Sequence, residues 1–192
     1  MSDSLIKLNL GCGPRQQEGL PEDDIKGWTN VDGRAMNGVD IVHDFNVFPW
    51  PWDDNSVDEI NASHVIEHLT DPLVAIMEMH RILKSNGKIT IRVPHKDGFF
   101  ACAIGHFHYF SMQWFENLKG LNCQQNDIGN DKFKNHSIYL NMFVPRVPWS
   151  PLVQFLIHRW EKYFNKNRSR QLAWEVLGIF HPGEIVWKAQ KF

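Results

Sequence analysis

The sequence has few cysteines, little net charge and no long hydrophobic run. Its 192 residues include only Cys12, Cys102 and Cys123, an odd and widely spaced set that is not typical of a disulfide framework. The formal net charge is −2, whereas broad nucleic-acid binding usually needs a strongly basic face. No apolar run approaches the roughly 18 residues of a membrane-spanning helix, and the first residues lack a basic segment followed by an apolar one. We therefore expect a cytoplasmic protein that neither spans a membrane nor binds nucleic acid.

Aromatic residues are abundant, with 13 Phe and 8 Trp. They favour a well-filled core and are compatible with an apolar substrate pocket. The length of 192 residues suits one compact domain with little to spare for a second. We therefore expect residues 1–192 to form a single domain.

The most informative segment runs from Leu8 to Pro14. Apolar residues alternate up to Leu10, which predicts a strand, and Gly11-Cys12-Gly13 follows directly. Glycines at the end of a strand let the backbone turn sharply and approach a ligand that a Cβ atom would exclude. Asp32 ends a second short strand 21 positions after Gly11, a spacing that suits a carboxylate reaching ribose hydroxyls. Together these features predict a nucleoside-cofactor site, although a lone glycine turn is more often a tight loop and Asp is common in turns.

Strand and helix patterns alternate through the first half of the chain. We expect further strands over residues 39–44, 57–62 and 88–94, and a helix that begins with Asp71 as its cap and ends at Asn86-Gly87. The predicted buried face of this helix consists of Leu73, Ile76, Met77, His80 and Leu83. Such alternation predicts an α/β fold with a mostly parallel sheet and helices on both faces.

One face of the strand over residues 88–94 is unusually polar. It carries Lys88, Thr90 and Arg92, whereas a parallel strand that is buried on both faces normally reads as a continuous apolar run.

The second half of the chain is less regular. We expect a helix, or a helix with a lid, over residues 99–118, strands over 137–144 and 184–188, and helix over 151–174. Basic residues gather over 159–170, most simply as a solvated helix face, or else as a surface that attracts an anionic acceptor. Residues 99–180 are therefore expected to supply an acceptor pocket, a lid or an interface, such as that of a homodimer.

In their order along the chain, these motifs resemble those of class I S-adenosylmethionine-dependent methyltransferases of the type 11 kind. Leu8 to Pro14 is similar to the first motif of that family, Asp32 to the acidic end of its second strand, and Asp44 to its adenine-binding carboxylate. Residues 53–60 and 63–69 resemble the run that enters the fourth strand and the segment that follows it. The resemblance implies a Rossmann-like fold and S-adenosylmethionine as cofactor.

The resemblance also implies individual roles around the cofactor. The backbone from Gly11 to Gly13 would approach the homocysteine part, and Asp32 would accept hydrogen bonds from both ribose hydroxyls. Asp44 would accept from the adenine amino group, beside the Phe45 main chain. The implied cofactor-binding residues are Leu10, Gly11, Cys12, Gly13, Asp32, Gly33, Asp44, Phe45, Ser63 and His64.

Methyl transfer requires a nucleophile aligned with the methyl–sulfur bond and, for a hydroxyl or protonated amine, a base. We expect an oxygen or nitrogen nucleophile on a small molecule or a glycan unit. Histidine suits the role of base at neutral pH, and the candidates are His95, His106 and His108, each of which is alternatively a hydrogen-bonded core residue. Neither His106 with His108 nor His64 with His68 has further ligands at a suitable spacing, so we expect no metal.

Two other functions stay open on the sequence alone. A nicotinamide-dependent oxidoreductase has a related fold, but its fingerprint needs a third glycine where this chain has Gln16. A catalytically silent protein that binds a cofactor or assembles with partners is the other alternative.

Overall fold

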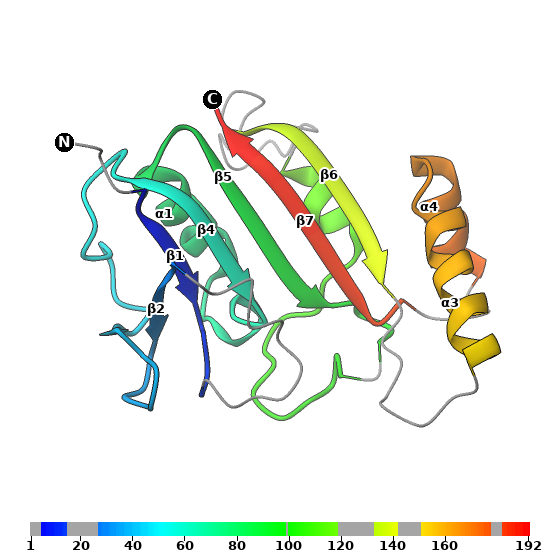
Figure 1. The fold of residues 1–192 in the computed structure, drawn as a ribbon, viewed down its shortest axis with the longest axis horizontal. Helices are drawn as coiled ribbons and strands as arrows, with labels where there is room; N and C mark the ends of the chain where they lie inside the picture. Colours follow the sequence, from blue (N-terminus) through cyan, green and yellow to red (C-terminus); the bar gives the residue numbers. More distant parts are fainter. Residues whose placement is uncertain (1–4, 15–26, 99, 119–132, 142–150, 178–181) are drawn as a thin grey trace.

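The strands of the computed structural model form one seven-stranded sheet with the order β3-β2-β1-β4-β5-β7-β6 (Figure 1). The structure describes residues 5–14, 27–98, 100–118, 133–141, 151–177 and 182–192. Neighbouring strands are parallel from β3 to β5, and β7 is antiparallel to both β5 and β6. The strands are β1 (Lys7–Leu10), β2 (Thr29–Asp32), β3 (Ile41–Val42), β4 (Val57–Ser63), β5 (Leu83–Pro94), β6 (Phe133–Asn141) and β7 (Glu184–Lys191). The predicted α/β fold with a mostly parallel sheet is confirmed.

The described helices lie behind the sheet or beside its outer edge in Figure 1. They are the 3-10 helix η2 (Ile66–His68) and the α-helices α1 (Pro72–Ile82), α2 (Met112–Asn117), α3 (Pro151–Phe164) and α4 (Arg168–Leu177). Helices α1 and α2 bury apolar residues against the strands in one core, which also includes Trp174 of α4. None of the described helices combines the length and the apolar character that crossing a bilayer requires.

Helix α1 begins where the sequence predicts and ends earlier than predicted. Asp71 caps it by accepting hydrogen bonds from the backbone N–H groups of Leu73 (2.9 Å) and Val74 (3.1 Å). The helix ends at Ile82, because Leu83 already pairs with Val57 in the sheet. The predicted end at Asn86-Gly87 is therefore wrong.

The buried face of α1 also differs from the predicted one. It consists of Pro72, Ala75, Ile76, Met79 and Ile82, so only Ile76 of the predicted helical positions belongs to it. Apolar residues lie on more than one side of this helix, and periodicity alone does not choose between the stripes. The small side chain of Ala75 lets the helix approach the sheet, which favours the observed stripe.

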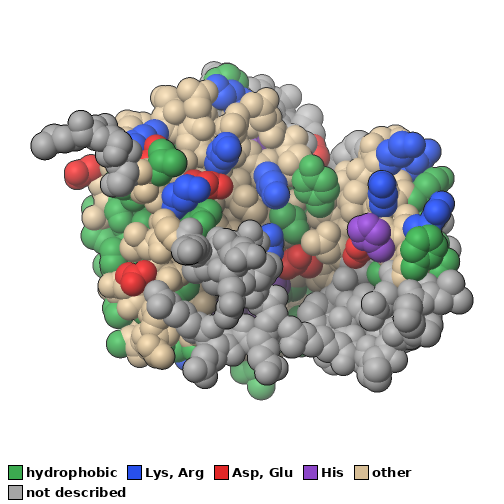
Figure 2. Space-filling view, in the orientation of Figure 1, with side chains coloured by type: hydrophobic (Ala, Val, Ile, Leu, Met, Phe, Trp, Pro, Cys, Tyr) green, Lys and Arg blue, Asp and Glu red, His purple; other side chains and the backbone are tan. Residues whose placement is uncertain are grey.

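The polar face of β5 has a structural explanation. Ile89, Ile91 and Val93 point into the core, whereas Thr90 and Arg92 point to the opposite side of the sheet. On that side the described helices do not cover the central strands, and Figure 2 shows lysine and arginine side chains over this face. The strand is therefore buried on one face only, and its other face lines a cavity.

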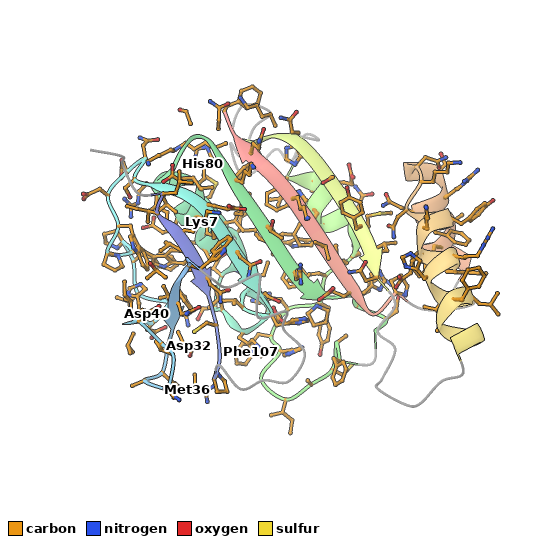
Figure 3. The ribbon with its side chains drawn as sticks, viewed as in Figure 1. Lys7, Asp32, Met36, Asp40, His80 and Phe107 are labelled. Carbon is orange, nitrogen blue, oxygen red and sulfur yellow. The ribbon has the colours of Figure 1, made fainter. Side chains whose placement is uncertain are left out.

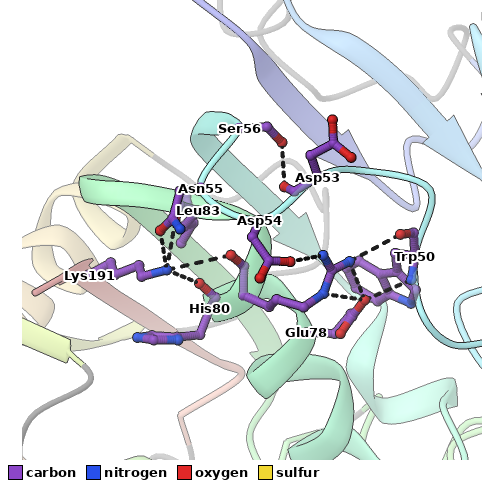
Figure 4. Close-up of polar contacts among 10 residues, drawn as sticks. Trp50, Asp53, Asp54, Asn55, Ser56, Glu78, His80, Leu83 and Lys191 are labelled. Carbon is purple, nitrogen blue, oxygen red and sulfur yellow. Dashed lines mark hydrogen bonds and ion pairs between the residues drawn. The ribbon is translucent and has the colours of Figure 1, made fainter.

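A charged network holds α1 against the loop before β4 (Figure 4). Arg81 donates to Glu78 Oε1 from Nε at 3.0 Å and from Nη2 at 2.6 Å, and to Asp54 Oδ1 from Nη1 at 2.5 Å. The same Glu78 oxygen accepts from the Trp50 backbone N–H at 2.7 Å. Burial raises the pKa of Glu78, but the hydrogen bonds from Arg81 and Trp50 outweigh it and hold that pKa below its ordinary value of 4.5.

Replacing Glu78 by Gln is expected to lower the free energy of unfolding at pH 7 by about 1–3 kcal/mol, the range for hydrogen bonds to charged groups. Because the folded pKa is lowered, this stability is present above pH 4.5 and is lost as the pH falls through the folded value. Urea titrations should therefore show a difference between the wild type and Glu78→Gln that shrinks in acid. The exposed Asp53→Asn variant should show no such pH-dependent difference, and a constant gap for Glu78→Gln would contradict the explanation.

Lys191 fastens the end of β7 to the end of α1. Its ammonium donates to the carbonyl oxygens of His80 (2.8 Å) and Leu83 (2.9 Å) and to Asn55 Oδ1 (2.8 Å), as Figure 4 shows. A cation at the carboxyl end of a helix is favoured by the helix dipole.

The pair α3 and α4 covers the outer edge of β6. The Asn165 side chain accepts from the Leu140 N–H at 2.8 Å and donates to the Leu140 carbonyl at 2.7 Å. Gln171 Nε2 donates to the Ile138 carbonyl. These amides occupy backbone groups that an edge strand otherwise leaves open.

The second half of the chain only partly follows the prediction. The predicted strands correspond to β6 and β7, and the helical stretch divides into α3 and α4. Residues 142–144 of the predicted strand lie outside the described residues. The long helix expected over residues 99–118 is reduced to α2, which has 6 residues.

Candidate functional site

A cavity of about 690 Å³ lies along the sheet at the carboxyl ends of its parallel strands. This is the edge where open α/β sheets bind ligands, and the volume falls within the range of about 300–1,000 Å³ for small-molecule sites. Eight of the ten predicted cofactor-binding residues line it, namely Gly11, Cys12, Gly13, Asp32, Gly33, Phe45, Ser63 and His64.

The glycine turn after β1 needs glycine for two reasons. Gly11 has a φ angle of +64°, in the left-handed region that side chains disfavour. A Cβ atom at Gly11 would also lie 2.2 Å from Val65 Cγ2. The turn is therefore pressed against the segment that follows β4, and its backbone faces the cavity.

Asp32 joins this turn to the end of β2. One carboxylate oxygen accepts from the Gly13 N–H at 3.0 Å and the other from the Arg34 N–H at 3.1 Å. The residue is only 8% exposed and lies at the lower edge of the sheet in Figure 3. A carboxylate has about four acceptor positions, so two remain for donors in the cavity.

Leu10 and Asp44 do not line the cavity. Leu10 is a fully buried core residue at the end of β1. Asp44 is exposed, and its carboxylate accepts from the Asn46 N–H at 2.9 Å within a turn. The adenine contact of Asp44 stays a prediction, while the neighbouring Phe45 does face the cavity.

A charged cluster at the end of β4 was not predicted from the sequence. His64 has a φ angle of +56°, and its ring nitrogens lie 3.2 Å from Glu67 Oε1 and 3.1 Å from Glu184 Oε1. Partial burial opposes protonation of the ring, but the hydrogen bonds to Glu184 and Glu67 outweigh it and raise the pKa of His64 to about 9. His64 is therefore a cation at neutral pH. The cluster could not be predicted from the sequence, because Glu184 belongs to β7 and lies 120 residues from His64.

The cavity has a second unpredicted part, which we call the polar wall: Asn9, Asn61, Thr90, Arg92 and Lys188. Asn9, Asn61, Thr90 and Lys188 lie in register across four neighbouring strands. Asn61 donates to Asn9 Oδ1 at 2.9 Å, which fixes the amides. The wall ends in two cations, Arg92 and Lys188.

The three histidines predicted as bases do not line the cavity. His95 is 0% exposed, and its Nδ1 accepts from the Asp97 N–H at 3.2 Å. His106 and His108 are half-buried in the loop before α2, with ring nitrogens against the carbonyl oxygens of Ala101 and Leu69. Their role as base stays a prediction, whereas His64 and His68 are the histidines that face the cavity.

A family model described as a methyltransferase domain matches residues 28–91. This range includes β2, β3, β4 and most of β5, and therefore Asp32, Phe45, Ser63 and His64 of the cavity. A search of curated proteins finds no match to this chain.

Solved structures similar to this chain show the same fold. One is a SAM-dependent methyltransferase from Archaeoglobus fulgidus, 14% identical, with a TM-score of 0.59 over 98% of this chain and 87% of that one. Another is a possible histamine N-methyltransferase from Thermotoga maritima, 14% identical, with a TM-score of 0.59 over 97% and 82%. A third is the complex of the Haloferax volcanii Trm112 methyltransferase activator with a putative methyltransferase, 18% identical, with a TM-score of 0.55 over 97% and 82%.

Proposed function

We propose that this protein is a class I S-adenosylmethionine-dependent methyltransferase that transfers the cofactor's methyl group to an oxygen or nitrogen atom of a polar small molecule or glycan unit. The polar wall is the observation that supports a polar acceptor. It lines the same cavity as the proposed cofactor-binding residues and extends across the sheet from them. An apolar acceptor would leave these amide, hydroxyl and charged groups without partners, at a cost in binding free energy.

The cofactor end of the cavity suits an adenosyl group. The carboxylate of Asp32 keeps acceptor positions for two ribose hydroxyls while it holds the glycine turn through the Gly13 N–H. The turn at Gly11 brings backbone rather than side chain to the ligand. The absence of a third glycine at position 16 suits a cofactor without a pyrophosphate.

The polar wall would hold the acceptor beside the methyl donor. Arg92 and Lys188 offer donors to hydroxyl or anionic groups, and Thr90 pairs directly with Lys188 across the sheet. Methyl transfer asks the protein mainly to align the nucleophile with the methyl–sulfur bond and to exclude water. Because His64 is protonated at neutral pH and both of its ring N–H groups are bonded to Glu67 and Glu184, it would contribute positive charge there and not act as the base.

Thermal unfolding tests the cofactor class directly. A ligand that binds only the folded state raises the melting temperature, and the stabilisation reaches about 2.7 kcal/mol at a concentration of 100 times Kd. We expect S-adenosylmethionine and S-adenosylhomocysteine to raise the melting temperature, and NAD to leave it unchanged. Stabilisation by NAD alone would instead support the oxidoreductase alternative.

The acceptor site is tested by Lys188→Met. We expect this change to lower kcat/KM for the acceptor by about tenfold or more, because a charged hydrogen bond contributes about 1.5–3 kcal/mol, and to leave the Kd for S-adenosylhomocysteine unchanged. The measurement is transfer of a labelled methyl group to panels of polyhydroxylated, amino and glycan compounds. Lys162→Met, an exposed change on α3, serves as control. Equal rates for the wild type and Lys188→Met would contradict the assignment of the polar wall to acceptor binding.

A further inference from the structure

We propose that Glu67, His68 and His106 form a binding site for one divalent transition-metal ion at the edge of the cavity. Their candidate ligand atoms all lie within 4.8 Å of one another. Bonds of about 2.0–2.2 Å to nitrogen and oxygen place two ligand atoms of a tetrahedral ion about 3.3–3.6 Å apart. The ligand atoms therefore need to move together by at most about 1.5 Å to hold an ion.

The two histidines present the ring nitrogens that a metal needs. His68 Nδ1 lies 2.9 Å from the Gly105 carbonyl oxygen, and His106 Nδ1 lies 3.2 Å from that of Ala101. Because a carbonyl oxygen only accepts, both Nδ1 atoms carry the proton, and the lone pair of each neutral ring lies on Nε2. A metal-binding histidine typically donates its second ring N–H to a carbonyl or carboxylate in this way.

Glu67 supplies the negative charge and is itself incompletely bonded. It is 0% exposed, and its Oε1 lies 3.2 Å from His64 Nδ1. Its Oε2 is buried and has no hydrogen-bond partner within the described part of the chain. A buried carboxylate oxygen without a partner is unfavourable, and an ion bound beside it would supply that partner.

The loop before α2 is fastened so that His106 stays beside η2. The Phe107 N–H donates to the Glu67 carbonyl at 2.8 Å, and His108 Nε2 lies 2.9 Å from the Leu69 carbonyl. Gly105 has a φ angle of +92°, which turns the loop back toward His68. Figure 3 labels Phe107 at the same edge of the sheet as Asp32. Two hydrogen bonds and one glycine turn thus position His106, which lies far from Glu67 in the sequence.

Two histidines and one carboxylate are typical ligands of Zn²⁺ and of first-row ions such as Mn²⁺ and Fe²⁺, and such a set leaves coordination positions open. His68 also lines the cavity. Given the proposed function, an acceptor hydroxyl bound to the ion would release its proton to water more readily. The oxygen would then form a bond to the methyl carbon as the methyl–sulfur bond breaks, leaving its electron pair on sulfur. The ion would thus favour an oxygen nucleophile.

Metal binding tests the site without any need for the acceptor. The full chain is treated with a chelator, and Zn²⁺ is titrated by calorimetry. We expect one equivalent to bind and to raise the melting temperature. His106→Gln and Glu67→Gln should each weaken Zn²⁺ binding at least tenfold, while His158→Gln, an exposed change on α3, should not. Equal Zn²⁺ affinity for wild type and His106→Gln, or no binding by the wild type, would overturn the proposal.

Cofactor binding separates this proposal from the proposed function. Each variant is titrated with S-adenosylhomocysteine, and the folded state is checked by circular dichroism. We expect His106→Gln to lose Zn²⁺ but to keep its cofactor affinity. If the wild type binds Zn²⁺ but no S-adenosylhomocysteine, the metal site stands and the proposed function fails. If Glu67→Gln does not fold because Glu67 is buried, the Zn²⁺ affinity of His106→Gln still tests the proposal, because His106 is only half-buried.

Discussion

Replacing Gly11 by Ala is expected to abolish cofactor binding and to lower the free energy of unfolding by several kcal/mol. The added Cβ atom would lie 2.2 Å from Val65 Cγ2, and a φ angle of +64° is unfavourable for alanine. A residue in such a backbone region costs about 1–3 kcal/mol, and the overlap with Val65 adds to it. Urea unfolding measures the stability, and titration with S-adenosylhomocysteine measures the binding.

Gly27 and Val65 provide the controls for this prediction. Gly27 has a φ angle of +89°, but a Cβ atom added there would have nothing within 4 Å among the described residues, so Gly27→Ala isolates the backbone penalty. Val65→Ala removes the colliding methyl groups, so the double variant Gly11→Ala/Val65→Ala should recover part of the lost stability. If Gly11→Ala and Gly27→Ala have equal effects, the close approach of Val65 has no energetic importance.

Replacing Asp32 by Ala is expected to lower the affinity for S-adenosylhomocysteine tenfold or more, equivalent to about 1.4 kcal/mol or above. The variant loses the proposed acceptor for the ribose hydroxyls and also leaves the Gly13 N–H without its partner. Asp32→Asn should fall between the wild type and Asp32→Ala, because an amide offers only one oxygen. Isothermal titration of each variant measures the difference.

Asp40 is the matched control for Asp32. Its carboxylate also accepts a backbone hydrogen bond, from the Asn30 N–H at 2.8 Å, but the residue does not line the cavity. Figure 3 shows both acids on the same side of the molecule. We expect Asp40→Asn to reduce stability without changing cofactor affinity. Unchanged affinity in Asp32→Ala would refute the assigned role of Asp32.

The sequence predicted those parts of the fold that local chemistry determines. Alternation of apolar residues located β1 and the second half of β5, and the Asp71 cap with Pro72 located the start of α1. The end of α1 was missed because it depends on pairing between Leu83 and Val57, which lie far apart in the chain. Elements that depend on such distant partners leave no periodic signal.

The same distinction holds for the candidate site. Gly11 and Asp32 were identified because they lie at strand ends, on the edge where parallel strands end, whereas Ser63 was identified through the resemblance to methyltransferases. The contacts of His64 with Glu184 and of His68 with the loop at Gly105 join segments that no spacing rule connects. The polarity of Thr90 and Arg92 was visible in the sequence. Only the structure explained it, because it shows that the described helices leave this face of β5 uncovered.

The pair of helices beside β6 limits how this protein can associate with itself. Asn165 and Gln171 already satisfy main-chain groups at Leu140 and Ile138, so another copy cannot add a strand there without first displacing α3 and α4. At the far border of the sheet, β3 presents just Ile41 and Val42. The described strands therefore leave little edge backbone with which a second copy could pair, and detachment of the two helices would expose the edge of β6 to pairing with other chains, which is a route to aggregation.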